Sequence, residues 1–563
     1  MKKLFLIILS VVICYPIFAQ NRFGLKEVTD KNRTEVENII KNIKTFQPSA
    51  KSRAAGVTPL PTFVDNSTGN DYFPGVVSQL GGSCGCASCV HYQYTYEYNY
   101  LYKLDADYPE NVYGYMFIWN LLNDGGETGT FPWDVYDAMK WYGVIPESSF
   151  MSCGLTKPYT ELPDGFDKYQ KGLPYSVDSY YKIKSDEVGQ ITTMKQYLYD
   201  HADGSTKGGV IQFSAYADPL TSNTYSGDSK TNYTAIIPKF GTTGMHSMII
   251  VGYDDDIWYD YNQDGNKDND ETGAFICINS WGEDWGDNGR FYAPYRTFTT
   301  AMEQGEGGTG NGGKYVYIVS PKKKEITLEQ RFLIKYDSRN DLSFEVGKGN
   351  LNANTLTPTK KVLLCKASQA ASWEGYKVLQ ELSSDVGMRG TSDDNADILH
   401  FSYDISQIKD YSGDYYYCDI KSSSIGSEIG TGKIILSYLI DYSDANNPIT
   451  YFGDIQTNEL KSDHTSRIIY RGLSDLPIDG DVQIVPYTLG DEIMLEVRAK
   501  DSKYVSVDLL AKDGQKLKAL IDETVEAGLQ YKEFDVSYLC SKDIPYYIRT
   551  NVSGIIQYTK IVF

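Results

Sequence analysis

The sequence predicts a mixed α and β domain followed by two all-β domains. Its 563 residues exceed what one hydrophobic core usually organises, so we expect roughly two to four domains. Helix patterns and strand patterns alternate up to about Pro321. Beyond this residue helix periodicity disappears, and short apolar runs separated by Asn, Gly, Ser and Asp predict strands and turns. Pro321, which three lysines follow, is therefore the expected boundary of the first domain.

The N-terminus has the pattern of a signal peptide. Two lysines precede an apolar run over residues 4–13, and Ala19 is a small residue at a suitable cleavage position. We expect removal of residues 1–19 and a protein that is secreted, periplasmic or held at the cell surface. No later stretch is apolar for long enough to span a bilayer.

The next residues, 20–58, are polar and helix-permissive. They predict either a short pro-segment or a plain leader, without an evident long inhibitory prodomain. Within the first domain, residues 59–321, a helix is expected over 132–142, because Pro132 suits its first turn and Gly143 its end. A glycine-rich loop and a last strand over 315–319 complete this domain.

Two β-sandwich domains are expected over residues 322–473 and 474–563. In the first, the runs 332–336, 361–365 and 433–438 predict strands. In the second, apolar runs flank the turns at Gly514 and Gly554, as in β-hairpins of a sandwich.

The charge of the chain excludes one class of partner. A formal net charge of −21 leaves no basic stripe to displace counterions from a phosphate backbone. We therefore expect no nucleic-acid partner.

Three separate pieces of the sequence together predict a nucleophilic cysteine site. Cys84 follows Gly-Gly-Ser, His246 stands in Gly-Met-His-Ser, and Asn279 precedes Ser-Trp-Gly. A thiolate attacks carbonyls far better than a thiol, and a neighbouring imidazolium lowers a thiol pKa by several units. A helix N-terminus alone favours the anion by only about 0.3–1 kcal/mol. We predict Cys84 as nucleophile, His246 as its base, Asn279 as the group that orients the imidazole, and Gln79 as an oxyanion donor beside the Cys84 backbone N–H.

Residues 59–321 resemble the papain-like cysteine peptidases. The matching segments are Gln79, Gly82–Cys84 with Ala87–Ser88, Gly129–Trp133 with Tyr142–Val144, His246 before an apolar strand, and Asn279–Gly282 with Trp285–Gly289. The resemblance implies a two-lobed α+β fold with a helical half and a β-barrel-like half. It also implies a cleft between the halves and endopeptidase activity on peptide or protein substrates.

Several departures from the family pattern keep a second interpretation open. The spacing from Gln79 to Cys84 is one residue short, whereas Cys86 as nucleophile would make it one residue long. Gly85 replaces the tryptophan that usually follows the nucleophile, and Thr130 replaces a glycine that pairs with substrate. The alternative is a catalytically inactive papain-like protein that binds or adheres at the cell surface.

Between His246 and Asn279 lies a twelve-residue calcium-loop pattern over residues 260–271. Such loops supply oxygen ligands from fixed positions and need a glycine at the sixth. The expected ligands of a structural Ca²⁺ are Asp260, Asn262, Asp264, the carbonyl of Asn266, Asp268 through a water, and Glu271. The pattern resembles the single loops of dockerins and secreted repeats, because flanking helices are not evident. We expect no organic cofactor.

The last block, residues 474–563, loosely resembles the C-terminal sorting or FlgD-like β-domains of secreted Bacteroidetes proteins. The terminal strand ends in Lys-Ile-Val-Phe at residue 563. The resemblance implies possible attachment to the cell surface through this domain.

The other cysteines are expected to be structural. Cys86 and Cys89 form C-x-x-C, but a zinc site is not expected without a second ligand pair. Either simple burial or a disulfide from one of them to Cys153 is expected, and Cys277 is expected to be a buried thiol.

One question of secondary structure stays open. Tyrosines at 92, 94, 96, 98 and 100 alternate with polar residues, which by periodicity alone predicts a strand. A nucleophile at a helix start requires a helix over the same residues.

Overall fold

The computed structural model describes Leu25, residue 30 and most of the chain from residue 32 to residue 563. The residues outside this description are 1–24, 26–29, 31, 52–58, 124–128, 151–160, 164, 186–187, 219, 221–234, 304–313, 338, 340–341, 353–354, 367–397, 423–430, 446–447, 455–458, 462–463, 472–480, 490–491, 513 and 542–544. The expected signal peptide, Cys153 and the boundary near residue 474 fall among them. No helix in the described ranges is long and apolar enough to cross a bilayer.

An antiparallel sheet forms one half of the first domain. Within the described residues it has the order β2-β7-β3-β4-β5-β6, and β1 pairs with β4. Its strands are β1 (Phe63–Asp65), β2 (Tyr175–Lys184), β3 (Ile211–Asp218), β4 (Thr243–Trp258), β5 (Thr272–Ile278), β6 (Arg290–Pro294) and β7 (Tyr315–Lys323). Alternate residues of β4 enter two different cores: Met248 and Ile250 one, Ile249 and Val251 the other. The apolar run of β4 is therefore a strand buried on both faces.

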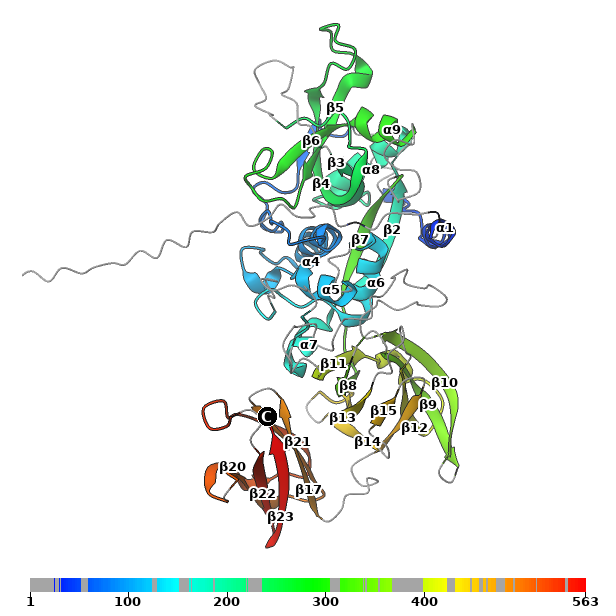
Figure 1. The fold of residues 1–563 in the computed structure, drawn as a ribbon. Helices are drawn as coiled ribbons and strands as arrows, with labels where there is room; N and C mark the ends of the chain where they lie inside the picture. Colours follow the sequence, from blue (N-terminus) through cyan, green and yellow to red (C-terminus); the bar gives the residue numbers. More distant parts are fainter. Residues whose placement is uncertain are drawn as a thin grey trace, which may run out of the picture.

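The helices of the first domain lie beside this sheet and below it, between the sheet and the following β strands (Figure 1). They are α1 (Arg33–Asn42), α3 (Cys84–Cys86), the π-helical η1 (Ala87–Tyr94), α4 (Thr95–Tyr102), α5 (Tyr115–Leu122), α6 (Pro132–Tyr142), α7 (Phe166–Gly172), α8 (Val188–Asp200) and α9 (Tyr295–Glu303), with the 3₁₀ turns η2 (Pro109–Asn111) and η3 (Asn269–Glu271). The expected helix over 132–142 is confirmed, and Gly143 ends it at φ +69°. Three segments, α3, η1 and α4, follow one another without a break from Cys84 to Tyr102.

The alternating tyrosines lie on this continuous helix and not on a strand. Tyr92 and Tyr96 pack into the core beside the sheet, whereas Tyr94 and Tyr98 pack into the core shared with the other helices. Residues two apart in a helix are about 200° apart, while residues four apart share a face. A period of two therefore fits a helix that is buried on both sides.

In the described part of the chain, the next nine strands form one hydrogen-bonded sheet in the order β10-β9-β12-β16-β14-β13-β8-β11, with β15 paired to β13. They are β8 (Leu328–Tyr336), β9 (Leu342–Asn352), β10 (Thr355–Lys366), β11 (Ile398–Asp404), β12 (Tyr415–Ser422), β13 (Thr431–Asp441), β14 (Ile449–Asp454), β15 (Glu459–Lys461) and β16 (Thr465–Arg471). Their apolar core is continuous with that of the helices, and the rings of Tyr142 and Tyr403 lie 5.6 Å apart. This β domain is thus packed firmly against the helical half.

The described residues of the C-terminal block form two sheets. One has the order β17-β18-β21 and the other β20-β19-β22-β23. The strands are β17 (Val482–Leu489), β18 (Glu492–Ala499), β19 (Lys503–Leu510), β20 (Lys516–Val525), β21 (Gly528–Asp535), β22 (Pro545–Val552) and β23 (Ile555–Val562). Apolar residues of β18 and β19 share one core, which is the arrangement expected of a β-sandwich.

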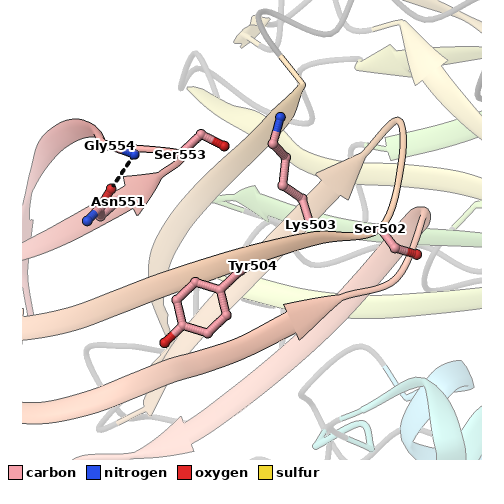
Figure 2. Close-up of a pocket in the computed structure, with 6 residues that line it drawn as sticks. All are labelled: Ser502, Lys503, Tyr504, Asn551, Ser553 and Gly554. Atoms are coloured by element: carbon pink, nitrogen blue, oxygen red, sulfur yellow. Dashed lines mark hydrogen bonds between the residues drawn. The ribbon is translucent and has the colours of Figure 1, made fainter.

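A shallow hollow of about 380 Å³ lies on this sandwich (Figure 2). Its lining is Ser502, Lys503, Tyr504, Asn551, Ser553 and Gly554. Ser553 and Gly554 both have positive φ, as the tight β22–β23 turn requires. The hollow contains no cysteine or histidine, so the chemistry expected from the sequence lies elsewhere.

Candidate active site

Cys84 begins the helix that runs through the middle of the first domain. Cys84 is fully buried and packs in a small apolar cluster with Met245, Tyr216 and Leu25. The segment that follows it, η1, is π-helical, a form that is rare and often found at functional sites.

The start of this helix is held against strand β4 on both sides of His246. Met245 packs against Cys84 in the same cluster, and the hydroxyls of Ser88 and Ser247 lie 2.5 Å apart. Gln212 on β3 donates a second hydrogen bond to the Ser247 hydroxyl at 2.7 Å. Sequence reasoning missed the Ser88–Ser247 contact, although Ser247 stands next to His246 in the chain.

His246 and Asn279 are directly bonded. His246 Nε2 lies 2.7 Å from Asn279 Oδ1, and both residues are fully buried. The same Oδ1 accepts the Ser280 backbone N–H at 2.7 Å, and the Trp281 ring stacks on the imidazole at 4.9 Å. The ring of His246 is therefore fixed in orientation through Nε2 and through its stacked face.

The Asn279 segment is also tied to the cysteine-bearing helix. Tyr92 on η1 donates its hydroxyl hydrogen to the Asn279 carbonyl at 3.0 Å and accepts the Val77 N–H at 2.9 Å. Because Tyr92 is buried between the two halves, this phenol joins helix, strand end and preceding loop in one network.

Gln79 lies beside the same loop. Its backbone N–H donates to the Ser280 carbonyl at 2.8 Å, and its Oε1 accepts the Ser280 hydroxyl at 2.5 Å. Its Nε2 donates to the Gly81 carbonyl at 2.9 Å. The structure thus brings Gln79 together with the Asn279 segment, with the amide group held from both sides.

The two departures at Gly85 and Thr130 are linked in space. A Cβ on Gly85 would lie 2.4 Å from Thr130 Oγ1, which is closer than atoms can approach. The threonine hydroxyl also lies 3.9 Å from Cys86 Sγ. A side chain at residue 85 and a hydroxyl at residue 130 therefore exclude one another.

The remaining cysteines near the site are buried thiols. Burial raises the pKa of Cys86 well above its usual range and that of Cys89 to about 12. Both are free in the structure, so burial and not a disulfide to Cys153 describes them; Cys153 itself lies outside the described residues. Cys277 is a buried free thiol, as expected.

Part of the leader lies over the site. The Leu25 N–H donates to the Met245 carbonyl at 3.2 Å, and Leu25 forms an isolated parallel β-bridge with Thr130. Further along, α1 buries Val36, Ile39 and Ile40 in the main core. Leu25 and α1 of the segment 20–58 are thus packed against the domain. Nothing in the sequence around Leu25 predicts its contact with Met245 and Cys84.

The leader continues as an added edge to the sheet. Thr45 bridges Lys182 of β2, and the Phe46 ring meets the Tyr197 ring edge-on at 5.6 Å. Beside it, the buried Glu97 carboxylate lies 2.8 Å from His201 Nε2 and accepts the Val210 N–H at 2.9 Å. Sequence reasoning missed this pair as well, because its members are far apart in the chain.

The other histidines are structural or exposed. His91 contacts Glu147 and the Gly75 carbonyl, His400 packs on Phe166, and His464 is exposed. The calcium-loop residues join β4 to β5. Among the described residues, no three His, Cys, Asp or Glu side chains already lie together as a metal cluster.

Comparisons with known proteins give similarity to solved structures only. No family model matches the chain, and no curated protein matches it. The structure is similar to proCathepsin B S9 from Trypanosoma congolense, with 13% identity and a TM-score of 0.34 over 54% of this chain and 87% of that chain. It is also similar to the digestive procathepsin L 3 of Tenebrio molitor larval midgut, with 15% identity and a TM-score of 0.31 over 53% of this chain and 83% of that chain. The recombinant stem bromelain precursor is similar with 13% identity and a TM-score of 0.31 over 54% of this chain and 84% of that chain.

These neighbours are proenzymes of papain-like cysteine peptidases, and they cover about half of this chain.

Proposed function

We propose that this chain is a secreted papain-like cysteine endopeptidase. The observation that carries the proposal is the buried His246 Nε2 to Asn279 Oδ1 contact of 2.7 Å, packed against the helix that Cys84 begins. A histidine oriented by an amide beside a cysteine at a helix start is the arrangement that thiol catalysis needs.

The proposed reaction is hydrolysis of a peptide bond. Cys84 passes its proton to His246 Nδ1, and the thiolate attacks the carbonyl carbon to form a tetrahedral intermediate. When the C–N bond breaks, His246 returns the proton to the leaving amine and an acyl-enzyme remains. His246 then takes a proton from water, which attacks the thioester carbonyl to form a second tetrahedral intermediate. The C–S bond breaks, the carboxylic acid leaves, and His246 returns the proton to the Cys84 thiolate.

Two further groups support this reaction. Asn279 keeps the imidazole in one tautomer and orientation through Oδ1. Gln79 and the Cys84 backbone N–H are the proposed donors to the oxyanion. Removal of one such donor costs roughly 3–4 kcal/mol of barrier in other hydrolases.

The organisation around the domain is part of the proposal. Residues 1–19 would be a signal peptide and 20–58 a pro-segment that covers Cys84 through Leu25. The peptidase domain would comprise residues 59–321, followed by β domains over 322–473 and 474–563. The last of these would attach the protein to the cell surface.

The test is covalent labelling of the full chain by a thiol-directed peptide probe. Because Leu25 covers Cys84, labelling is measured in the wild type and in Leu25→Asp, with Cys84→Ala and Cys86→Ala added to each. We expect Leu25→Asp to speed labelling roughly 10-fold or more, since burial of a leucine stabilises by about 1.5–3 kcal/mol. Labelling should disappear in Cys84→Ala and persist in Cys86→Ala.

Absence of labelling in both the wild type and Leu25→Asp would contradict the proposal. It would support the alternative of a non-catalytic surface binding protein. Labelling lost through Cys86→Ala alone would move the nucleophile to Cys86.

A further inference from the structure

The connection between β4 and β5 is an acidic loop over residues 260–271 with an ordered hydrogen-bond pattern. The proposed peptidase reaction does not use it. It begins two residues after β4 and ends where β5 starts, at the end of the hairpin opposite His246 and Asn279. In Figure 1, β5 lies at the upper end of the molecule, away from the β domains.

The first half of the loop curls around one carboxylate. Asp260 Oδ2 accepts the Gly265 N–H at 2.9 Å, and Asp260 Oδ1 accepts the Asp264 N–H at 3.2 Å. The turn depends on Gly265, whose φ of +78° strongly disfavours a side chain. The sixth-position glycine therefore has the role that a calcium loop requires of it.

A second observation is independent of this turn. Glu271, the last residue of the loop, is 1% exposed. Its Oε1 accepts the backbone N–H groups of Tyr261 at 2.8 Å and Asn262 at 3.3 Å, so the carboxylate points into the loop. Its Oε2 is buried and accepts no hydrogen bond from the described residues. A buried carboxylate oxygen without a donor is costly, and a cation would satisfy it.

The exposed side chains of the loop face each other across one amide. Asn262 Nδ2 lies 3.3 Å from Asp264 Oδ2 and 3.2 Å from Asp268 Oδ2. A donor thus stands between two carboxylates. Rotation of this amide by 180° would present its oxygen at the same place, as a cation ligand.

We propose that this loop binds one Ca²⁺ ion. The side chains of Asp260, Asn262, Asp264 and Glu271, the carbonyl of Asn266 and a water held by Asp268 would supply the ligands. An all-oxygen set with a buried carboxylate at the last position suits Ca²⁺, which takes six to eight oxygens in flexible geometry, better than Mg²⁺. Binding would draw the exposed carboxylates toward Glu271.

Such an ion would stiffen the hairpin that carries His246 and Asn279. Both strands leave the loop within two residues of a proposed ligand, and the loop contacts α9 through Arg296, whose guanidinium lies 4.7 Å from the Tyr261 ring. The effect would be on stability, because the loop is separated from the catalytic side chains by the length of β5.

The test uses Tb³⁺ luminescence and thermal unfolding of the intact chain. Tyr261, inside the loop, should sensitise bound Tb³⁺, and Ca²⁺ should displace it with a dissociation constant of roughly 10⁻⁵–10⁻³ M. Ca²⁺ in excess should raise the unfolding midpoint by several degrees, whereas Mg²⁺ at the same concentration should not.

Three variants locate the site. Glu271→Gln keeps the shape of the side chain and should weaken Ca²⁺ binding at least about tenfold, and the exposed Asp264→Asn should do the same without risk to the core. Asp270→Asn is the matched control. That side chain is 71% exposed and pairs with Arg296 at 2.8 Å, outside the ligand set.

Binding unchanged in Asp270→Asn and lost in the other two would support the site. An unfolding midpoint unaffected by Ca²⁺, equal effects of Ca²⁺ and Mg²⁺, or equal losses in all three variants would overturn it. If Glu271→Gln does not fold, Asp264→Asn against Asp270→Asn decides. None of these outcomes depends on peptidase activity.

Discussion

At one end of the β4–β5 hairpin, His246 and Asn279 are fully buried and bonded to each other, while Trp281 covers the imidazole. At the other end, most of the loop over residues 260–270 is exposed, and its carboxylates are held mainly by backbone N–H groups of the loop itself. The same two strands therefore support a packed polar network at one end and a charged surface loop at the other.

The difference shows how each end gains its order. Around His246 and Asn279, packing and hydrogen bonds from distant segments fix the imidazole and the amide oxygen, so no ligand is needed for geometry. At the tip, like charges gather with only Glu271 buried, and repulsion between them is relieved best by a cation. Two predictions compare the two ends, and a third compares a buried ion pair elsewhere in the domain with the exposed pair at the tip.

The largest effect is expected at the His246–Asn279 end. His246→Ala removes the proposed base and should lower kcat/KM for a fluorescent protein substrate at least about 10³-fold, measured in a Leu25→Asp background. Asp270→Asn, at the tip, should leave kcat/KM unchanged. Equal losses in the two variants would mean that the ends are not functionally distinct.

Replacing a glycine by alanine at either end should destabilise the protein, but for different reasons. Gly85→Ala places a Cβ against Thr130 Oγ1 and should destabilise by about 1–3 kcal/mol through overpacking. Gly265→Ala meets open space and should cost about 1–2 kcal/mol through its positive φ alone. Urea unfolding of double variants separates the two: Thr130→Ala should recover stability in Gly85→Ala and not in Gly265→Ala. Recovery in neither would refute the steric link.

The smallest effect concerns buried and exposed ion pairs. Burial opposes a charge on His201, but the Glu97 carboxylate outweighs it and raises the pKa of His201 above its usual 6.5. The histidine therefore adds stability below about pH 6.5, and this stability is lost as pH rises through the higher pKa of the folded state.

Unfolding midpoints measured across this pH range test the pair. His201→Gln should lower the free energy of unfolding by about 1 kcal/mol at pH 6 and by less at higher pH. Asp270→Asn removes an exposed pair and should lose less than about 1 kcal/mol, equally at both pH values. A His201→Gln deficit that grows with pH would contradict the assigned direction.

Several elements could be predicted from the sequence because their signals are local. Pro132 and Gly143 bound the helix between them, and the Ser553-Gly554 turn joins two strands as expected. The tyrosine alternation misleads because periodicity does not reveal whether one face or both faces of a helix are buried. The leader contact at Leu25 and the Glu97–His201 pair were missed, since each joins segments that only the folded chain brings together.

The sequence by itself determined which chemical groups are available: a cysteine after Gly-Gly-Ser, a histidine in an apolar strand, an asparagine before Ser-Trp-Gly, and a loop of regularly spaced oxygens. These depend on residue type and short spacing, which the chain carries directly. Only the tertiary structure decided which groups meet. The 2.7 Å bond between His246 and Asn279 and the seating of Leu25 over Cys84 arise because packing of two cores around one helix brings distant segments together, and such long-range contacts leave no periodic trace in the sequence.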